Sequence, residues 1–163
     1  YSILGQIYLV LPLALLGVWG YKSDYQLFMN TEYLLMALFV FVWTNDTGAY
    51  IVGCTLGKHR LFERISPKKS WEGFFGGLAF CIILASLANY IIPGMLSTAQ
   101  WIGMGILTSI FSTWGDLCES LLKRTAGVKD SGKILPGHGG ILDRFDSELI
   151  ASPVIFIYLT FVL

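Results

Sequence analysis

The chain has 163 residues, of which 55% are hydrophobic and 13% are charged, with eleven basic and eleven acidic side chains. Ordinary soluble domains carry about 25% charged residues, whereas residues 73–115 contain no Asp, Glu, Lys or Arg at all. A membrane-spanning helix needs only about 20 apolar residues, and a soluble domain of this size has too small an interior to bury so long a run. The composition therefore excludes a soluble protein and predicts an all-α, polytopic integral membrane protein.

Apolar stretches separated by polar or Gly/Pro segments predict about five transmembrane helices. These stretches cover residues 3–20, 33–57, 74–92, 100–115 and 149–163. Asn45 and Asp46 interrupt the second stretch, and the fourth continues as a charged helix to Arg124. Before the third stretch, we expect Ser66 to cap a helix whose first residue is Pro67.

The ends of the chain predict a piece of a longer protein. The chain begins with Tyr1 rather than Met, and it ends inside the last apolar stretch. The 15 residues of that stretch would reach only about 22 Å as a helix, which is short of a bilayer core of about 30 Å. We therefore expect residues 1–163 to form a single membrane-embedded domain whose last helix continues beyond Leu163.

Basic residues are concentrated in two of the connections between the apolar stretches. With five transmembrane helices, alternate connections share a side of the membrane, so residues 58–72 and 123–147 fall together. These two connections carry ten of the eleven Lys and Arg residues, and the opposite side carries only Lys22. By the positive-inside rule, the two basic connections are cytoplasmic.

Asp46 is an acidic residue inside the second apolar stretch, in the segment "WTNDTGAY". A carboxylate at the bilayer centre costs about 2.5–3.5 kcal/mol on insertion scales. Asp46 should therefore face a polar cavity, a cation or a partner. The alternative is a structural role near the helix end, where Asp46 reaches interfacial water or bonds Thr44 or Thr47.

Two acidic pairs lie at the second basic connection. Asp116 and Glu119 precede it and share a helix face with Lys123, whereas Asp143 and Asp146 lie in the loop, near its end. Two carboxylates about 4 Å apart repel by about 1–4 kcal/mol, and a divalent cation between them would remove that repulsion. Oxygen ligands suit Mg²⁺, which takes one or two carboxylates plus substrate phosphates. The pattern predicts a metal–phosphate site, although a surface ion-pair ladder is the alternative for the first pair.

The segment between the acidic pairs is basic and rich in glycine. "PGHGG" at residues 136–140 supplies three glycines that can adopt positive φ, and successive backbone N–H groups there can bind an anion. His138 is a phosphate ligand, an acid–base group or a residue that shapes the turn. The Lys68–Lys69 pair of the first basic connection contacts either lipid headgroups or a substrate phosphate. Further candidate phosphate ligands are Lys123, Arg124, Lys129 and Lys133.

Several contiguous motifs carry these residues. "SLLKR" from Ser120, a Lys129-Asp130 pair and "PGHGGILDRFD" ending at Asp146 follow one another along the chain. "WTNDTGAYIVGCTLGKH", "RISPKKSWEG" and "GDLCES" precede them, so that the motifs cover the chain from about Trp43 onward. Together they resemble the signature of the phosphatidate cytidylyltransferase family, also called CDP-diacylglycerol synthases.

The resemblance implies a multi-span membrane enzyme that joins CTP and phosphatidic acid into CDP-diacylglycerol and pyrophosphate and requires Mg²⁺. Family members are longer and dimeric. The chain would then be the C-terminal catalytic portion of a homodimeric enzyme of phospholipid synthesis, with residues 116–147 as a cytoplasmic signature segment. We expect it in the bacterial plasma membrane, in contact with membrane lipid and without a nucleic-acid partner.

The resemblance also implies roles for single residues. Asp116 and Asp143 would be the main ligands of a two-metal site, with Asp146 and Glu119 supporting them directly or through water. The catalytic set would be Asp116, Lys123, Asp143 and Asp146. The substrate-binding set would be Asp46, Lys68, Lys69, Arg124, Lys129, His138 and Arg144.

Two other functions are alternatives. A CTP-dependent lipid-alcohol kinase, of the dolichol or phytol type, would transfer the γ-phosphate of CTP to a hydroxyl group and release CDP. A transporter that uses Asp46 as an intramembrane ion ligand belongs to a different class. It would account for that residue, but not for a glycine-rich loop flanked by two acidic pairs.

Overall fold

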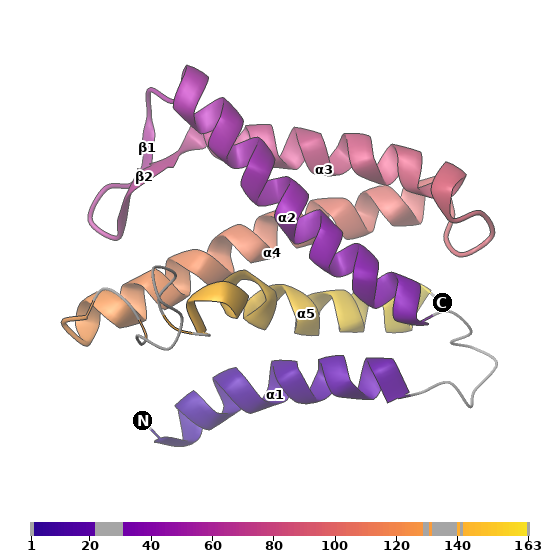
Figure 1. The fold of residues 1–163 in the computed structure, drawn as a ribbon, viewed down its shortest axis with the longest axis horizontal. Coiled ribbons are helices and arrows are strands. Elements are labelled where there is room, and N and C mark those ends of the chain that lie inside the picture. The colour runs from indigo at the N-terminus through magenta and orange to yellow at the C-terminus, as the bar shows by residue number, and fades with distance from the viewer. Residues whose placement is uncertain (1, 22–30, 129–130, 132–139, 141, 163) are drawn as a thin grey trace.

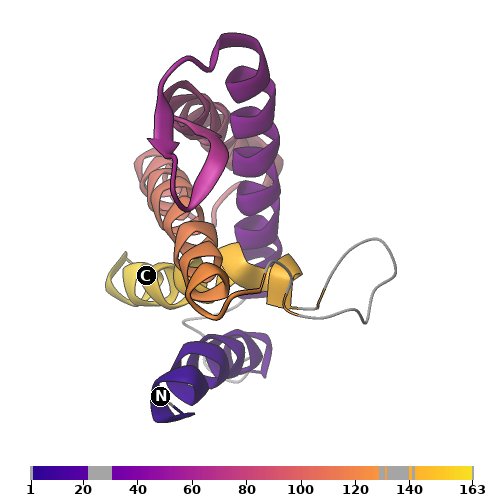
Figure 2. The same cartoon turned by 90° about the vertical axis from the view of Figure 1, so that its left-hand side faces the viewer.

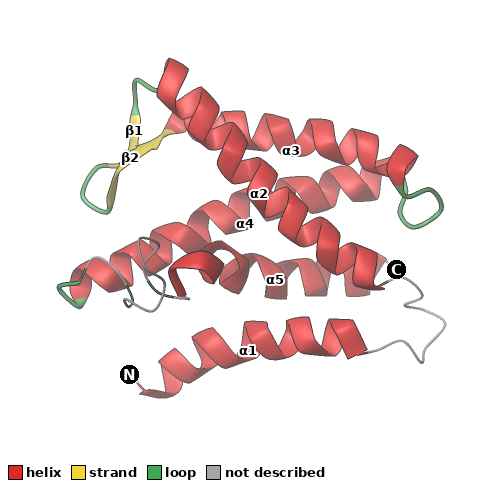
Figure 3. Cartoon of the chain, viewed as in Figure 1, coloured by secondary structure: helices red, strands yellow, loops and turns green. Residues whose placement is uncertain are grey.

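The computed structural model describes residues 2–21, 31–128, 131, 140 and 142–162. These residues form helices joined by connections and one β-hairpin (Figures 1 and 3). In chain order the elements are α1 (Ser2–Tyr21), α2 (Thr31–Leu56), β1 (Arg60–Phe62), β2 (Ser66–Ser70), α3 (Trp71–Ile91), α4 (Thr98–Thr125) and α5 (Leu142–Val162). The predicted all-α class is confirmed.

Among the described residues, three helical segments are long and apolar enough to cross a membrane: Tyr33–Leu56, Trp71–Ile91 and Phe145–Val162. A shorter apolar segment, Tyr8–Gly17, lies in α1. Helix α4 is less apolar because its middle carries hydroxyl side chains, but these are buried against protein. The polytopic membrane class is therefore confirmed, whereas the number of five transmembrane helices stays a prediction.

Helix α4 is the centre of the bundle. It lies between α3 and α5 and is crossed by α2, whereas α1 packs mainly along α5 (Figures 1 and 2). Two large side chains of α4, Trp101 and Met104, are completely buried, and the Trp101 ring lies 6.3 Å from that of Phe41 on α2. The hairpin, the end of α4 and the start of α5 gather at one end of the bundle (Figure 1). The described parts of both basic connections therefore lie at the same end of the bundle, as the charge pattern predicts.

Helices α2 and α3 approach closely through glycine. A Cβ atom at Gly77 would lie 2.5 Å from Oδ1 and 2.7 Å from the backbone oxygen of Asn45, and one at Gly76 would collide with Val52. Small residues allow such contact between membrane helices, where association depends on packing rather than on the hydrophobic effect. The seam fixes Asn45, and with it Asp46, relative to the start of α3.

The predicted cap at the start of α3 was wrong. Ser66 and Pro67 belong to strand β2, and Ser70 is the N-cap, with its hydroxyl accepting a hydrogen bond of 3.1 Å from the Gly73 amide. Pairing of Arg60 with Ser70 extends the backbone up to the cap. A proline is tolerated there because both strands of a two-stranded sheet are edges.

The predicted start of the last helix was also wrong. Helix α5 begins at Leu142 rather than Leu149, so Asp143 and Asp146 lie in its first turns and not in a loop. The Asp143 carboxylate accepts a hydrogen bond of 2.7 Å from the Gly140 amide. A negative charge in the first turn of a helix is favourable because backbone N–H groups there lack partners.

We expect Gly77→Ala to lower the stability of the full-length protein in detergent by about 1–3 kcal/mol, measured as a lower thermal unfolding temperature. The added methyl group collides with Asn45, including its backbone, and this outweighs the gain of about 1 kcal/mol in helix propensity. Gly17→Ala is the matched control, since nothing lies within 4 Å of a Cβ there. Equal unfolding temperatures for the two variants would show that the seam is not tightly packed.

Candidate active site

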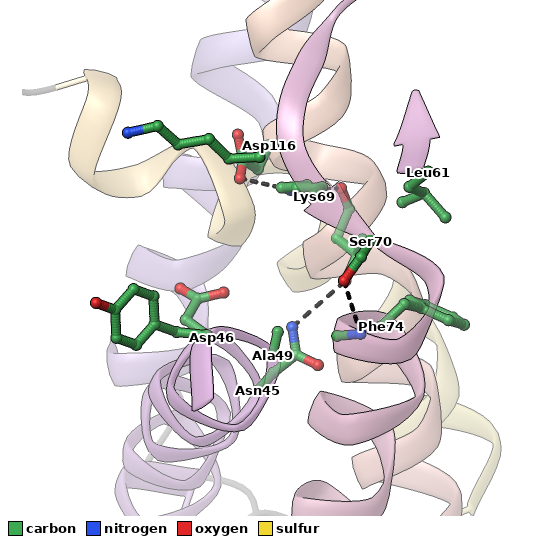
Figure 4. Close-up of a pocket in the computed structure, with 12 residues that line it drawn as sticks. Asn45, Asp46, Ala49, Leu61, Lys69, Ser70, Phe74 and Asp116 are labelled. Atoms are coloured by element: carbon green, nitrogen blue, oxygen red, sulfur yellow. Dashed lines mark hydrogen bonds and ion pairs between the residues drawn. The ribbon is translucent and has the colours of Figure 1, made fainter. Parts of the chain in front are cut away.

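A pocket of about 250 Å³ lies between α2, the hairpin, the start of α3 and the middle of α4 (Figure 4). It brings together four of the predicted site residues from three distant parts of the sequence: Asp46, Lys68, Lys69 and Asp116. Its remaining lining combines small polar groups with an apolar wall that includes Leu61 and Phe74. The pocket can therefore hold a charged group beside an apolar one.

Lys69 links the hairpin to α4 across this pocket. Its Nζ atom lies 2.5 Å from Oδ2 of Asp116 and donates to the backbone oxygen of Thr113 at 3.5 Å. The other carboxylate oxygen of Asp116 accepts a hydrogen bond of 3.2 Å from the Ser120 hydroxyl. Asp46 points from α2 toward the same cavity (Figure 4). One lysine thus pairs with Asp116 and lies within electrostatic range of Asp46.

A buried hydrogen-bond network holds the Asp46 end of the pocket. Asn45 is 2% exposed; its amide donates to Ser112 at 3.1 Å and to Thr113 at 3.4 Å, and its oxygen accepts from Ser109 at 2.6 Å. All three partners lie on α4. Because a buried amide without partners is costly, the network fixes the rotation of α2 against α4. The sequence marks Asn45 only as a polar residue in an apolar run.

Lys123 forms the second charged centre, on the last turn of α4. Its Nζ atom lies 2.8 Å from Oε2 of Glu119 and 2.8 Å from Oδ1 of Asp143. Burial lowers the pKa of Lys123, but its bonds with the two carboxylates outweigh this effect and raise that pKa. Burial likewise raises the pKa of Asp143, but hydrogen bonds from the lysine and from two backbone amides hold that pKa below its usual range. Both groups are therefore charged near neutral pH.

A close approach of α4 and α5 joins the two acidic pairs. A Cβ atom at Gly115 would lie 2.7 Å from the backbone oxygen of Asp146, so only glycine fits there. The approach places the Asp146 carboxyl against that of Glu119 and within electrostatic range of Asp116. Three of the four predicted metal ligands thus converge, whereas Asp143 reaches the group through Lys123.

The buried end of this group fits a divalent cation. Glu119 is 1% exposed, its Oε2 atom is ion-paired with Lys123, and its Oε1 atom has no hydrogen-bond partner among the described residues. Oxygen-only ligands, one or two of them carboxylates, are what Mg²⁺ usually takes from a protein. Among the described residues, however, no three acidic, His or Cys side chains are arranged at metal-binding distance. The geometry thus offers the carboxylate pair of Glu119 and Asp146, with Lys123 bound to Glu119 and Lys69 bound to the neighbouring Asp116.

Other predicted site residues lie elsewhere or outside the described part of the chain. Arg124 is exposed at the end of α4 and lines a separate hollow with the hairpin turn. Lys129, Lys133 and His138 fall outside the described residues, as does the side chain of Arg144. Their roles stay predictions.

Two buried polar groups near the site have no motif that could have revealed them. Glu148 on α5 is 3% exposed, and its Oε2 atom has no hydrogen-bond partner among the described residues. Tyr8 on α1 places its hydroxyl near the carboxylates of α4 and α5. Glu148 follows the signature, and Tyr8 lies in an apolar helix; neither belongs to a sequence pattern that predicts a site. Their position near the site is seen only in the folded structure.

Comparison with known proteins shows the family to which the chain belongs. The sequence model of a family described as "Cytidylyltransferase family" matches residues 3–162. Curated phosphatidate cytidylyltransferases of Staphylococcus aureus (strain COL) and Staphylococcus haemolyticus are each 41% identical, over 160 and 159 residues, and one of Staphylococcus epidermidis is 40% identical over 159. The alignments cover 98% of this chain and 61% of each relative, so the chain spans less than two thirds of their length. With the match extending over nearly all its residues, the chain belongs to the cytidylyltransferase family.

Proposed function

We propose that the protein is a CTP:phosphatidate cytidylyltransferase, which condenses CTP and phosphatidic acid to CDP-diacylglycerol and pyrophosphate. The observation that carries the proposal is the position of Asp116. It ion-pairs with Lys69 in the pocket and lies within electrostatic range of the half-buried Asp146, whose carboxyl lies against that of Glu119. Cationic and anionic groups at the end of a membrane bundle suit a reaction between two phosphate groups. The names of the relatives support the choice of substrates.

The chemistry requires two anions to meet. A phosphate oxygen of phosphatidic acid attacks the α-phosphorus of CTP, a new O–P bond forms, and the bond to the β-phosphate breaks to release pyrophosphate. The attacking phosphate is already ionised near pH 7, so no general base is needed. Lys69 and Lys123 would neutralise the approaching and leaving phosphates. Such electrostatic stabilisation is the main source of catalysis in phosphoryl-transfer reactions.

Mg²⁺ would supply the remaining positive charge by polarising the transferred phosphate and stabilising the leaving pyrophosphate. Glu119 and Asp146 would hold it, together with Asp116, and Asp143 would join a second ion. Lys69 and Lys123 now occupy oxygens of these carboxylates. With a cation held by those oxygens, Lys69 and Lys123 would be free to bind substrate phosphates.

The membrane context follows from the same proposal. We place the hairpin and residues 116–147 on the cytoplasmic side of a bacterial plasma membrane, where soluble CTP and membrane phosphatidic acid can both reach the pocket. The positive-inside rule supports this orientation. A homodimer in contact with membrane lipid is part of the proposal, and its support is the family resemblance.

Labelled CTP distinguishes the proposed reaction from the kinase alternative. With the full-length protein, phosphatidic acid and Mg²⁺, we expect label in the cytidine or the α-phosphate of CTP to enter the lipid product. Label in the γ-phosphate should leave with pyrophosphate. Entry of γ-label alone, with a lipid alcohol as acceptor, would establish the kinase instead.

The Asp143→Asn variant tests the acidic residues. We expect CDP-diacylglycerol formation to fall by at least about 100-fold, since asparagine cannot supply the negative charge that the cation and Lys123 require. Asparagine keeps an acceptor oxygen for the Gly140 amide, so the variant should fold. Glu63→Gln, on the exposed hairpin turn, is the matched loss of a carboxylate and should keep full activity. Full activity of Asp143→Asn would exclude the metal role.

The Lys69→Met variant separates phosphate binding from metal binding. We expect the kcat/KM for CTP to fall by about 10–100-fold because a cation in the pocket is lost. The Mg²⁺ concentration for half-maximal activity should fall or stay unchanged, since Lys69 no longer competes for Asp116. Lys58→Met, at an exposed position, is the control. A higher Mg²⁺ requirement would contradict the exchange between lysine and cation.

A further inference from the structure

Tyr8 brings a polar group from the first helix to the carboxylates. Helix α1 packs along α5, and the Tyr8 hydroxyl lies within electrostatic range of Asp116, Glu119 and Asp146. The oxygen of this hydroxyl is buried and has no hydrogen-bond partner among the described residues. No motif extends into this helix, which otherwise reads as an apolar membrane segment.

An unpaired phenol at such a place points to a ligand. Buried side-chain polar atoms are hydrogen-bonded in the large majority of cases, and a buried polar group without a partner costs about 1–3 kcal/mol. The Tyr8 hydroxyl shows this deficiency, and within its electrostatic range lies Glu119, whose Oε1 atom has no hydrogen-bond partner among the described residues while its Oε2 atom pairs with Lys123. The phenol can donate, and the carboxylate can only accept. A ligand that satisfies both must form a hydrogen bond with the phenol and place a positive charge beside the carboxylate.

A hydrated divalent cation has these properties. Mg²⁺ keeps several of its water molecules when a protein binds it through one or two carboxylates. The waters can accept from or donate to a phenol, while the ion itself contacts carboxylate oxygens. Groups that hold the outer shell of a metal orient its ligands and raise the affinity of the site.

We propose that Tyr8 is a positioning residue, whose hydroxyl hydrogen-bonds the hydration shell of a divalent cation held by Glu119 and Asp146. This inference rests on the proposed function for its cation, and it makes α1 part of the site. The hydroxyl touches neither the transferred phosphate nor the lysines, so its effect is on cation affinity. The expected signature is a changed Mg²⁺ dependence rather than a lost activity at saturating Mg²⁺.

The Tyr8→Phe variant of the full-length protein in detergent tests the inference, because it removes only the hydroxyl. The primary measurement is the thermal unfolding temperature as a function of Mg²⁺ concentration, without substrates. We expect the midpoint of the Mg²⁺-dependent rise to move to about 3- to 10-fold higher concentration. The Mg²⁺ requirement of the reaction should move by the same factor. Tyr90→Phe, at a side chain that is 84% exposed on α3, is the matched control and should leave both unchanged.

The measurement without Mg²⁺ separates this role from a structural one. Since the hydroxyl has no partner in the described structure, Tyr8→Phe should not lower the unfolding temperature in EDTA. An equal loss of stability with and without Mg²⁺, an unshifted midpoint, or a wild-type protein that Mg²⁺ does not stabilise would each overturn the inference. A shifted midpoint in a protein that forms no CDP-diacylglycerol would support Tyr8 and contradict the proposed function.

Discussion

Charge neutralisation by two lysines is the constraint on which this site depends. Lys69 reaches from the hairpin to Asp116, and Lys123 joins Glu119 to Asp143 across the start of α5. An unpaired buried charge costs several kcal/mol, and removing one partner of a buried pair is strongly destabilising. Cations from separate elements therefore help Asp116, Glu119 and Asp143 to lie together at the end of a membrane bundle. The same pairs tie the hairpin and α5 to the central helix.

Much of the fold could be predicted because apolar length and chain breakers determine membrane helices. The expected fourth helix, continued to Arg124, agrees with α4 (Thr98–Thr125), which ends within one residue of that prediction. Its start follows from a local signal, the capping box of Ser97 and Gln100. Helix α5 was placed too late because Asp143, Asp146 and the residues between them read as a polar loop. Hydropathy cannot tell a polar residue that faces protein from one that faces water.

The site was predictable only where its residues belong to a contiguous motif. Asp46, Lys69 and Asp116 come from three motifs, and the pocket brings them together. The cap at Ser70 was missed because it depends on pairing of the two strands, a contact between residues distant in the chain. The position of Tyr8 depends on how α1 packs against α5, for which the sequence offers no pattern. Spacing reveals chemistry within an element, whereas packing decides which elements share a site.

The arrangement of rigid and exchangeable contacts bears on how the proposed reaction would proceed. The glycine contact at Gly115 and the Asn45 network fix α2, α4 and α5 by close packing and fully paired hydrogen bonds. The lysines, by contrast, end in flexible side chains that can leave a carboxylate without moving a helix. In the proposed function, a cation would displace a lysine from the carboxylates and leave it free for phosphate. Cation and substrate binding would then favour one another, because each removes a competitor of the other while the backbone stays in place.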